Sequence, residues 1–261
     1  MNIGELVLVG SGIELGRHVS QRVISEITSA EVVFSMTDPW AHEWLLGLRP
    51  DTVALQDFYG RDKDRRQSYR EMDVAIMAAV RAGHRVCAVF YGHPGVFADV
   101  PHETLRKARS EGHRARMEPG ISAEACLYAD LGMDPGRNGV QSLEATHFLV
   151  HEHVINPSAL LILWQVALAG DLSCTHFHAE PDRLRVLVEK LRQWYPPDTE
   201  VILYEAAQIA VDCFRADRMA LADLPTADYR EYTTLVIPPI RKPVPDQRFL
   251  DTLNGLLSPS R

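Results

Sequence analysis

Apolar and polar positions follow two alternating periods along the chain. Short runs rich in Val, Leu and Ile are separated by longer stretches whose apolar residues recur at helical spacing. Buried parallel strands read as continuous apolar runs, so this alternation is typical of βα units and predicts an α/β fold with mainly parallel sheets. The runs predict strands at Leu6–Val9, Val32–Phe34, Val86–Phe90, Phe148–Val150, Leu160–Gln165, Val201–Tyr204 and Thr233–Ile237. The amphipathic stretches predict helices at Arg17–Thr28, Trp40–Leu46, Arg65–Ala82, His102–Ser110, Ala123–Leu131 and Pro181–Trp194.

A turn-rich region near the middle divides this pattern. The segments "MEPGIS" and "GMDPGRNG" contain Gly and Pro, which interrupt regular elements, and each side has its own strands. We therefore expect two α/β lobes, at 1–118 and 119–240. The proline-rich segment that follows predicts a C-terminal tail at 241–261.

Charge and composition exclude some partners. The formal net charge of −8 gives no overall positive field, so nucleic acid is not expected as a partner. No apolar run approaches membrane-spanning length, and the N-terminus lacks the features of a signal peptide, which predicts no membrane association and a cytoplasmic location. The four cysteines lie far apart without a CxxC pair, which suits a reducing compartment and predicts core positions.

Two glycine-containing loops follow predicted strands. Ligands of open α/β sheets bind beyond the carboxyl ends of strands, so "YGHPG" at Tyr91–Gly95 is a candidate site, although a plain turn is the alternative. The other loop, "VGSGIELG", suggests a dinucleotide site, but its third glycine, Gly16, comes one residue late for the fingerprint. No acid stands at the position expected to bind a ribose, which argues against a nicotinamide enzyme.

Histidines suggest a metal site without completing one. The pairs His151 and His153, and His176 and His178, have alternate spacing that would point both side chains to one side of an extended segment. No motif ties either pair to a third ligand. The sequence therefore predicts no bound metal.

The stretch "DFYGRDKDRRQSYREM" places a cation beside an apolar helix face. Tyr69, Met72 and Ile76 recur at helical spacing, and Arg65 stands one turn before Tyr69. A buried guanidinium must pair or meet a ligand, and Tyr59 ends a preceding apolar run from which it could reach the same cleft. The alternative is that Arg65 extends to water beside a half-buried Tyr69.

Several motifs together resemble a known family. The segments "VGSGI", "VFYGHPGVF", "PGISAEACLYADLGMDP", "EAT", "LWQV" and "TTLVIPP" look like those of S-adenosylmethionine-dependent tetrapyrrole methylases, and more narrowly like those of borosin peptide backbone α-N-methyltransferases. The resemblance extends from about Glu5 to Pro239. It implies two α/β lobes with the methyl donor, S-adenosyl-L-methionine, in the cleft between them and S-adenosyl-L-homocysteine as product.

The resemblance also implies roles for individual residues. In the borosin branch a Tyr, Arg, Tyr set acts on the peptide, and it matches Tyr59, Arg65 and Tyr69 here. On that basis Arg65 and Tyr69 would stabilise the amide oxygen, and Tyr59 would take the proton if Arg65 favours its phenolate, although which of the three takes it stays open. Donor contacts would come from Tyr91, His93, Val96, Ser122, Ala123, Gln165, Ala206, Thr233 and Thr234.

The resemblance departs from the fungal members after "VIPP". Those members continue into a helical clasp and a core peptide, whereas this sequence ends soon after that motif. We therefore expect a split member that forms a homodimer and methylates a separate precursor peptide. The alternatives are a small-molecule methylase acting on a tetrapyrrole or corrin precursor, and a module that binds donor or peptide without turnover.

Overall fold

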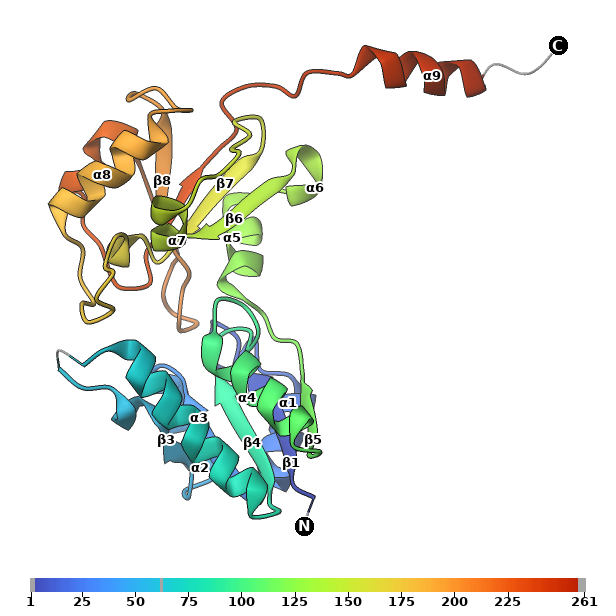
Figure 1. Cartoon of the computed structure of the whole chain (residues 1–261), viewed down its shortest axis with the longest axis vertical. Helices are drawn as coiled ribbons and strands as arrows, with labels where there is room; N and C mark the ends of the chain where they lie inside the picture. The colour runs from blue at the N-terminus through green and yellow to red at the C-terminus, as the bar shows by residue number, and fades with distance from the viewer. Residues whose placement is uncertain (1–2, 62, 258–261) are drawn as a thin grey trace.

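Two sheets organise the chain, each with helices on both faces (Figure 1). The computed structural model describes residues 3–61 and 63–257. We call the sheet β1–β5 with its helices the first lobe, and the sheet β6–β10 with its helices the second lobe. The protein thus has the mixed α/β architecture that the hydrophobic pattern predicts.

All neighbouring strands of the first sheet are parallel, in the order β3-β2-β4-β1-β5. Leu6 and Leu8 of β1 pack with α3 and α4 on one face, while Val7 and Val9 pack with α1 and α2 on the other. Both faces are therefore buried, which explains the continuous apolar runs. The first-lobe elements are β1 Glu5–Gly10, α1 Gln21–Ser29, β2 Val32–Met36, α2 Pro39–Leu48, β3 Val53–Ala54, the 3₁₀ helix η1 Leu55–Phe58, α3 Arg65–Arg81, β4 Arg85–Phe90, α4 Asp99–Ser110 and β5 Arg114–Met117.

The second sheet is mixed, in the order β6-β7-β10-β8-β9, and only β6 and β7 pair in parallel. The expectation of a mainly parallel sheet is therefore wrong for this lobe. Its elements are α5 Ala123–Leu131, α6 Pro135–Asn138, β6 Val140–Glu144, α7 Ala145–Val150, β7 Leu160–Trp164, η2 Val166–Leu168, α8 Pro181–Leu191, β8 Glu200–Glu205, β9 Arg215–Ala220, η3 Leu221–Thr226 and β10 Thr234–Ile237. After β10 the chain leaves the lobe and forms α9, Gln247–Leu257, which lies away from both lobes (Figure 1).

Local signals fix some of these boundaries. Helix α5 begins after Ser122, whose hydroxyl accepts from the Ala125 N–H, and ends at Gly132 with a φ of 63°. The sequence predicts its bounds at the observed residues, since a serine N-cap and a left-handed glycine are strong start and stop signals. The predicted strand Phe148–Val150 is wrong, because Glu144 caps helix α7 there and Phe148 is buried on the helical side.

Polar residues and cysteines add detail to the core. Asp73 of α3 is buried and pairs with Lys107 of α4. Of the cysteines, Cys87 lies in the core, Cys126 and Cys174 are half-buried, and Cys213 is exposed, so the core prediction is wrong for Cys213. Among the described residues, no helix is long and apolar enough to cross a membrane.

Candidate active site

Three loops of the first lobe meet backbone to backbone at Gly10, Gly92 and Gly120, which we call the glycine junction. A Cβ on Gly10 would lie 2.1 Å from the Gly92 carbonyl oxygen, and one on Gly120 would lie 2.7 Å from the same atom. Gly92 has a φ of 68°, in the left-handed region that favours glycine. The ends of β1 and β4 and the segment after β5 therefore approach so closely that no side chain fits between them.

Gly12 of the "GSG" motif takes part in the same backbone packing. Gly12 donates its N–H to the Gly92 carbonyl at 3.1 Å, and Gly92 returns a bond to the Gly12 carbonyl at 3.0 Å. A Cβ on Gly12 would lie 2.1 Å from the Cβ of His18. Close contact between two loops therefore explains these glycines without a dinucleotide.

The loop after β4 carries the first predicted donor residues. The Tyr91 N–H donates to the Met36 carbonyl at 2.9 Å, and burial raises the pKa of the Tyr91 phenol. The Gly95 N–H donates to Nδ1 of His93 at 2.9 Å, and the Val96 N–H donates to the His93 carbonyl at 3.2 Å. Both the side chain and the backbone carbonyl of His93 therefore hold the shape of this loop.

The second lobe places its predicted donor residues at one edge of its sheet. Strands β7 and β8 both run antiparallel to β10, so their ends lie beside the start of β10. Gln165 follows β7 with a φ of 55°, an uncommon conformation for a residue with a side chain. Ala206 follows β8, and Thr234 begins β10 opposite Tyr204.

Thr233 is held by protein groups on every side. Its hydroxyl donates to Glu205 Oε1 at 2.6 Å and accepts from the Arg230 N–H at 2.8 Å. Its carbonyl accepts from the Val166 N–H at 3.2 Å, and the residue is fully buried. Thr233 therefore ties the start of β10 to the ends of the two strands beside it.

The two groups of predicted donor residues meet across the lobes. Ala123 and Ala206 pack against the same cluster, which contains Trp164. The Phe97 ring, in the loop after β4, lies 5.4 Å from the Trp164 ring. The structure thus places strand ends of both lobes near one another through the contact of Phe97 with Trp164, and the glycine junction on the first-lobe side is filled by backbone of the loops themselves.

Tyr59, Arg65 and Tyr69, which we call the tyrosine–arginine wall, lie together, Tyr59 after η1 and the other two in the first turns of α3. The Tyr59 and Tyr69 rings are 6.3 Å apart and meet edge to face. Arg65 begins the helix after the cap residue Asp64, whose side chain accepts from the Arg66 N–H. Tyr59 therefore reaches the helix face that carries Tyr69, as its position after an apolar run allowed.

Arg65 pairs with the second lobe and does not extend to water. Its Nη1 donates to the His176 carbonyl at 2.9 Å, its Nη2 lies 3.7 Å from Asp171 Oδ2, and its guanidinium lies 5.0 Å from the centre of the Phe177 ring. Only 11% of the side chain is exposed. The prediction that this cation must find a partner is confirmed, as its desolvation requires.

Sequence reasoning missed Asp171 and Phe177. The Phe177 ring also lies 5.9 Å from the Tyr59 ring, so it adds a third aromatic to the wall. The only signal in the sequence was the requirement for an acid near Arg65. His176 and His178 bond Asp171 and Glu180, and no group of three His, Cys, Asp or Glu suited to a metal occurs in the described part of the chain.

The pKa of Tyr59 departs from the expectation drawn from its neighbour. Burial and the adjacent Tyr69 raise the pKa of the Tyr59 phenol, and the opposing effect of Arg65 is smaller. Burial also raises the pKa of Tyr69. Arg65 lowers the pKa of Tyr59, as the hypothesis of a Tyr59 phenolate requires, but burial and Tyr69 raise it more, so the surroundings of Tyr59 favour the protonated phenol.

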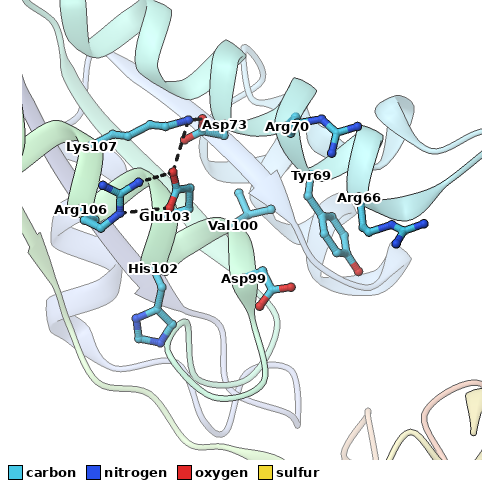
Figure 2. A pocket seen from close by; sticks show the side chains of 10 residues that line it. All are labelled: Arg66, Tyr69, Arg70, Asp73, Asp99, Val100, His102, Glu103, Arg106 and Lys107. Atoms are coloured by element: carbon cyan, nitrogen blue, oxygen red, sulfur yellow. Dashed lines mark hydrogen bonds and ion pairs between the residues drawn. The ribbon is translucent and has the colours of Figure 1, made fainter. Parts of the chain in front are cut away.

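A groove of about 590 Å³ runs beside Tyr69 between α3 and α4 (Figure 2). Its lining is charged, with Arg70 and Asp99 near Tyr69 and Arg106 and Lys107 further along. Of the three residues of the wall, Tyr69 lines this groove and Tyr59 and Arg65 do not.

Comparison with known proteins places the chain in a family. Residues 5–210 match Tetrapyrrole (Corrin/Porphyrin) Methylases. Uroporphyrin-III-C-methyltransferase from Thermus thermophilus has the same fold, with a TM-score of 0.62 at 19% identity, and the similarity covers 99% of this chain and 98% of that one. Cobalt precorrin-4 methyltransferase has a TM-score of 0.64 at 15% identity, over 90% and 94% of the two chains.

Curated relatives are more similar in sequence. A methyltransferase/ribosomally synthesized cyclic peptide gymnopeptides precursor of Gymnopus fusipes is 36% identical over 90% of this chain and 57% of its own length. The omphalotin A counterpart of Omphalotus olearius is 35% identical over 90% and 58%. The chain spans little more than half the length of these relatives. Since the family match covers most of the sequence, the chain belongs to the Tetrapyrrole (Corrin/Porphyrin) Methylases.

Proposed function

We propose that the protein is an S-adenosyl-L-methionine-dependent methyltransferase that N-methylates backbone amides of a peptide. The observation that carries this proposal is the tyrosine–arginine wall, in which a buried arginine held by the second lobe lies in one aromatic cluster with two phenols whose surroundings favour the protonated form. Relatives whose names join methyltransferase to cyclic peptide precursor support a peptide as substrate.

A backbone amide nitrogen is a weak nucleophile because its lone pair is delocalised into the carbonyl. Hydrogen bonds to the carbonyl oxygen stabilise the imidate-like charge that develops as the N–H proton leaves, and one such donor is typically worth about 3 kcal/mol. Arg65 and Tyr69 suit this role because both are donors. Burial holds Tyr59 in its protonated form, so we assign it to the same oxygen and leave removal of the amide proton to another base or water.

We place the methyl donor between the two lobes. The sulfonium of S-adenosyl-L-methionine supplies an electrophilic methyl group and leaves as S-adenosyl-L-homocysteine. We assign donor binding to the residues gathered at the strand ends, with the loops that leave the glycine junction on one side and Gln165 in its left-handed conformation on the other. Thr233, whose polar groups bond within the protein, would support Gln165 through Val166.

We further propose that the precursor is a separate chain and that the enzyme is a homodimer. The names of the relatives join methyltransferase and peptide precursor in one protein, and a separate precursor would differ from that arrangement. The test must therefore supply the peptide in trans. The described residues after β10 leave the second lobe, and α9, which lies away from both lobes, exposes Phe249, Leu253 and Leu256, an apolar set that suits a second copy. Sedimentation of the full chain would give a dimer mass, and a monomer would contradict this part.

The experiment that tests the function is tandem mass spectrometry of peptides incubated with the enzyme and donor. Short peptides encoded beside the gene are supplied in trans, and steps of one methyl mass must map to backbone nitrogens. The Arg65→Ala variant should give no product while binding donor normally, and Arg185→Ala, an exposed arginine paired only with Asp182, should behave as wild type.

Two results would overturn the proposal. Turnover of a tetrapyrrole precursor, with every peptide unmodified, would show a small-molecule methylase. Tight donor binding with no product from either substrate class would show a module without turnover.

A further inference from the structure

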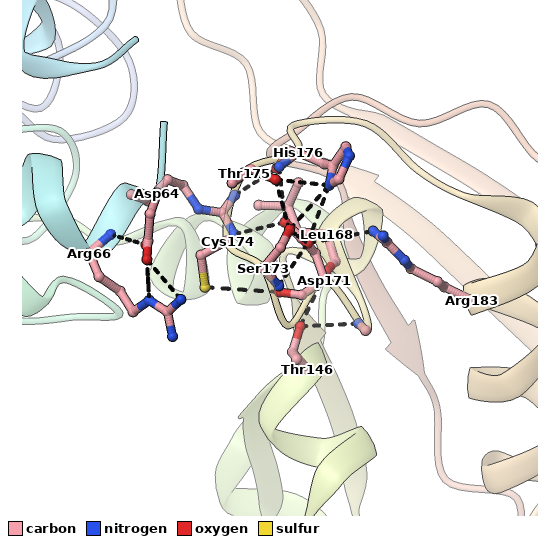
Figure 3. Close-up of polar contacts among 12 residues, drawn as sticks. Asp64, Arg66, Thr146, Leu168, Asp171, Ser173, Cys174, Thr175, His176 and Arg183 are labelled. Atoms are coloured by element: carbon pink, nitrogen blue, oxygen red, sulfur yellow. Dashed lines mark hydrogen bonds and ion pairs between the residues drawn. The ribbon is translucent and has the colours of Figure 1, made fainter. Parts of the chain in front are cut away.

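Asp171 is a buried carboxylate with an unusual number of partners. Only 2% of the residue is exposed. Its oxygens accept from the Ser173 hydroxyl at 2.5 Å and from the His176 N–H at 3.0 Å (Figure 3). Burial alone would raise the pKa of Asp171, but these hydrogen bonds outweigh it and hold the pKa below its usual range. The group is therefore a fixed negative charge inside the protein.

The same carboxylate lies between two arginines from different lobes. Arg65 Nη2 of α3 is 3.7 Å from Oδ2, and Arg183 Nη1 of α8 is 3.8 Å from Oδ1. One acid shared by two guanidiniums leaves net positive charge, so Arg65 is oriented without being neutralised. That is the state in which it can still stabilise a developing oxyanion.

The segment around Asp171 also binds Arg65 through two backbone carbonyl groups. The Cys174 carbonyl accepts from the backbone N–H of Arg65 at 2.9 Å, and the His176 carbonyl accepts from Nη1 of its side chain. Asp171 sets the shape of this segment because it bonds the backbone of both Ser173 and His176. Loss of the carboxylate would therefore release the charge partner and the carbonyl partner of Arg65 together.

We propose that Asp171 is the positioning residue for Arg65, by which the second lobe completes the peptide-methylating site of the first. The proposal rests on the proposed function for its effect on turnover, but its structural part, the orientation of Arg65, can be tested without any substrate. Asp171 touches no reacting atom, so it acts through Arg65.

The kinetic test uses Asp171→Asn, which keeps shape and removes charge. We expect kcat for the peptide to fall by about 100-fold with KM and donor affinity within about twofold of wild type, since misplacing a catalytic group costs that much. Asp171→Glu, which restores the charge, should recover part of the loss. Asp182→Asn, an exposed acid paired with Arg185, is the matched control and should leave kcat unchanged.

A second variant separates positioning from general support of the lobes. Arg183→Gln removes the other cation and leaves the contacts of Arg65 in place, so kcat should change by less than about threefold. Equal losses in Asp171→Asn and Arg183→Gln, or a fall in donor affinity that matches the fall in kcat, would overturn the proposal in favour of a structural role.

The substrate-free test records the guanidinium NMR signals of Arg65, assigned by their loss in Arg65→Lys. In wild type the Arg65 signals should show slowed rotation, which Asp171→Asn abolishes and Asp182→Asn preserves. Unchanged signals in Asp171→Asn would overturn the positioning role whatever the substrate is. Slowed rotation in wild type that is lost in Asp171→Asn, together with no peptide turnover by wild type, would instead contradict only the proposed function.

Discussion

The glycine junction and the tyrosine–arginine wall are assembled by opposite means. At the junction, three loops of one lobe touch through bare backbone, and a single added methyl group has no space. At the wall, a helix of the first lobe presents charged and aromatic side chains, which residues of the second lobe hold by charge and hydrogen bonds.

Because of this difference, the two regions should tolerate different kinds of substitution. The junction depends on the absence of atoms, so it should respond to volume and be indifferent to pH. The wall depends on the charge and orientation of Arg65, so it should respond to chemistry at constant volume. Variants that change only one property at a time therefore distinguish them.

The largest effect is expected from Gly10→Ala. The added Cβ would lie 2.1 Å from the Gly92 carbonyl oxygen, and the backbone there cannot move without breaking the sheet end. Chemical denaturation should show a loss of about 3 kcal/mol in unfolding free energy, with donor affinity lost as well. Gly47→Ala is the matched control: its site in α2 is open, so it should stabilise the protein by about 0.5–1 kcal/mol. A Gly10→Ala variant as stable as wild type would contradict the tight junction.

Arg65→Lys tests the wall at constant charge. Lysine cannot bond the His176 carbonyl and face Asp171 with one planar group, so peptide turnover should fall by about 100-fold, or about 2.7 kcal/mol. Donor affinity, measured by calorimetry, should not change because the glycine junction is intact. Arg185→Lys on α8 is the control, since that side chain pairs only with exposed Asp182. Full activity in Arg65→Lys would show that charge alone suffices.

Interior strands could be predicted from the sequence, and edge strands could not. The apolar runs found β1, β2, β4, β7, β8 and β10, all of which have a partner on each side. The missed strands β3, β5, β6 and β9 are the four edges, and segments such as "RARM" and "RADRMA" lack apolar runs because one side meets solvent. Hydrophobic pattern reports burial, and edge strands are only partly buried.

The candidate site divides in the same way. That Arg65 needs a partner follows from its place on an apolar helix face, and that inference required no structure. The identity of the partner did not follow, because Asp171 lies in an irregular segment of the other lobe with no periodic signal. The tight packing of the glycine junction was equally hidden, since contacts among Gly10, Gly92 and Gly120 join segments far apart in sequence.

Tyr59→Phe tests the wall through pH. The pKa of Tyr59 is raised in the folded protein, whereas in the unfolded chain it stays near 10, so between pH 9 and 11 only the unfolded state loses the proton. Proton loss from the unfolded state favours unfolding, and wild type loses stability as pH rises through that window. The variant lacks this term, so over the same interval its unfolding free energy should fall by about 1.4 kcal/mol less than that of wild type. Parallel pH profiles for the two proteins would show that Tyr59 titrates normally.

The smallest effect concerns Ser122, which has one role in the fold and a second proposed role in donor binding. Its hydroxyl accepts from the Ala125 N–H at 3.2 Å and caps α5. Ser122→Ala should therefore cost about 1 kcal/mol of stability, whereas Ser122→Gly should cost only a few tenths, because glycine tolerates the cap position. If the hydroxyl also contacts the donor, both variants should weaken donor binding by about fivefold, the effect of one hydrogen bond. Calorimetry on Ser122→Gly decides the matter, since this variant keeps the helix: wild-type affinity there would leave Ser122 as a helix cap only and shift donor binding toward the backbone of the glycine junction.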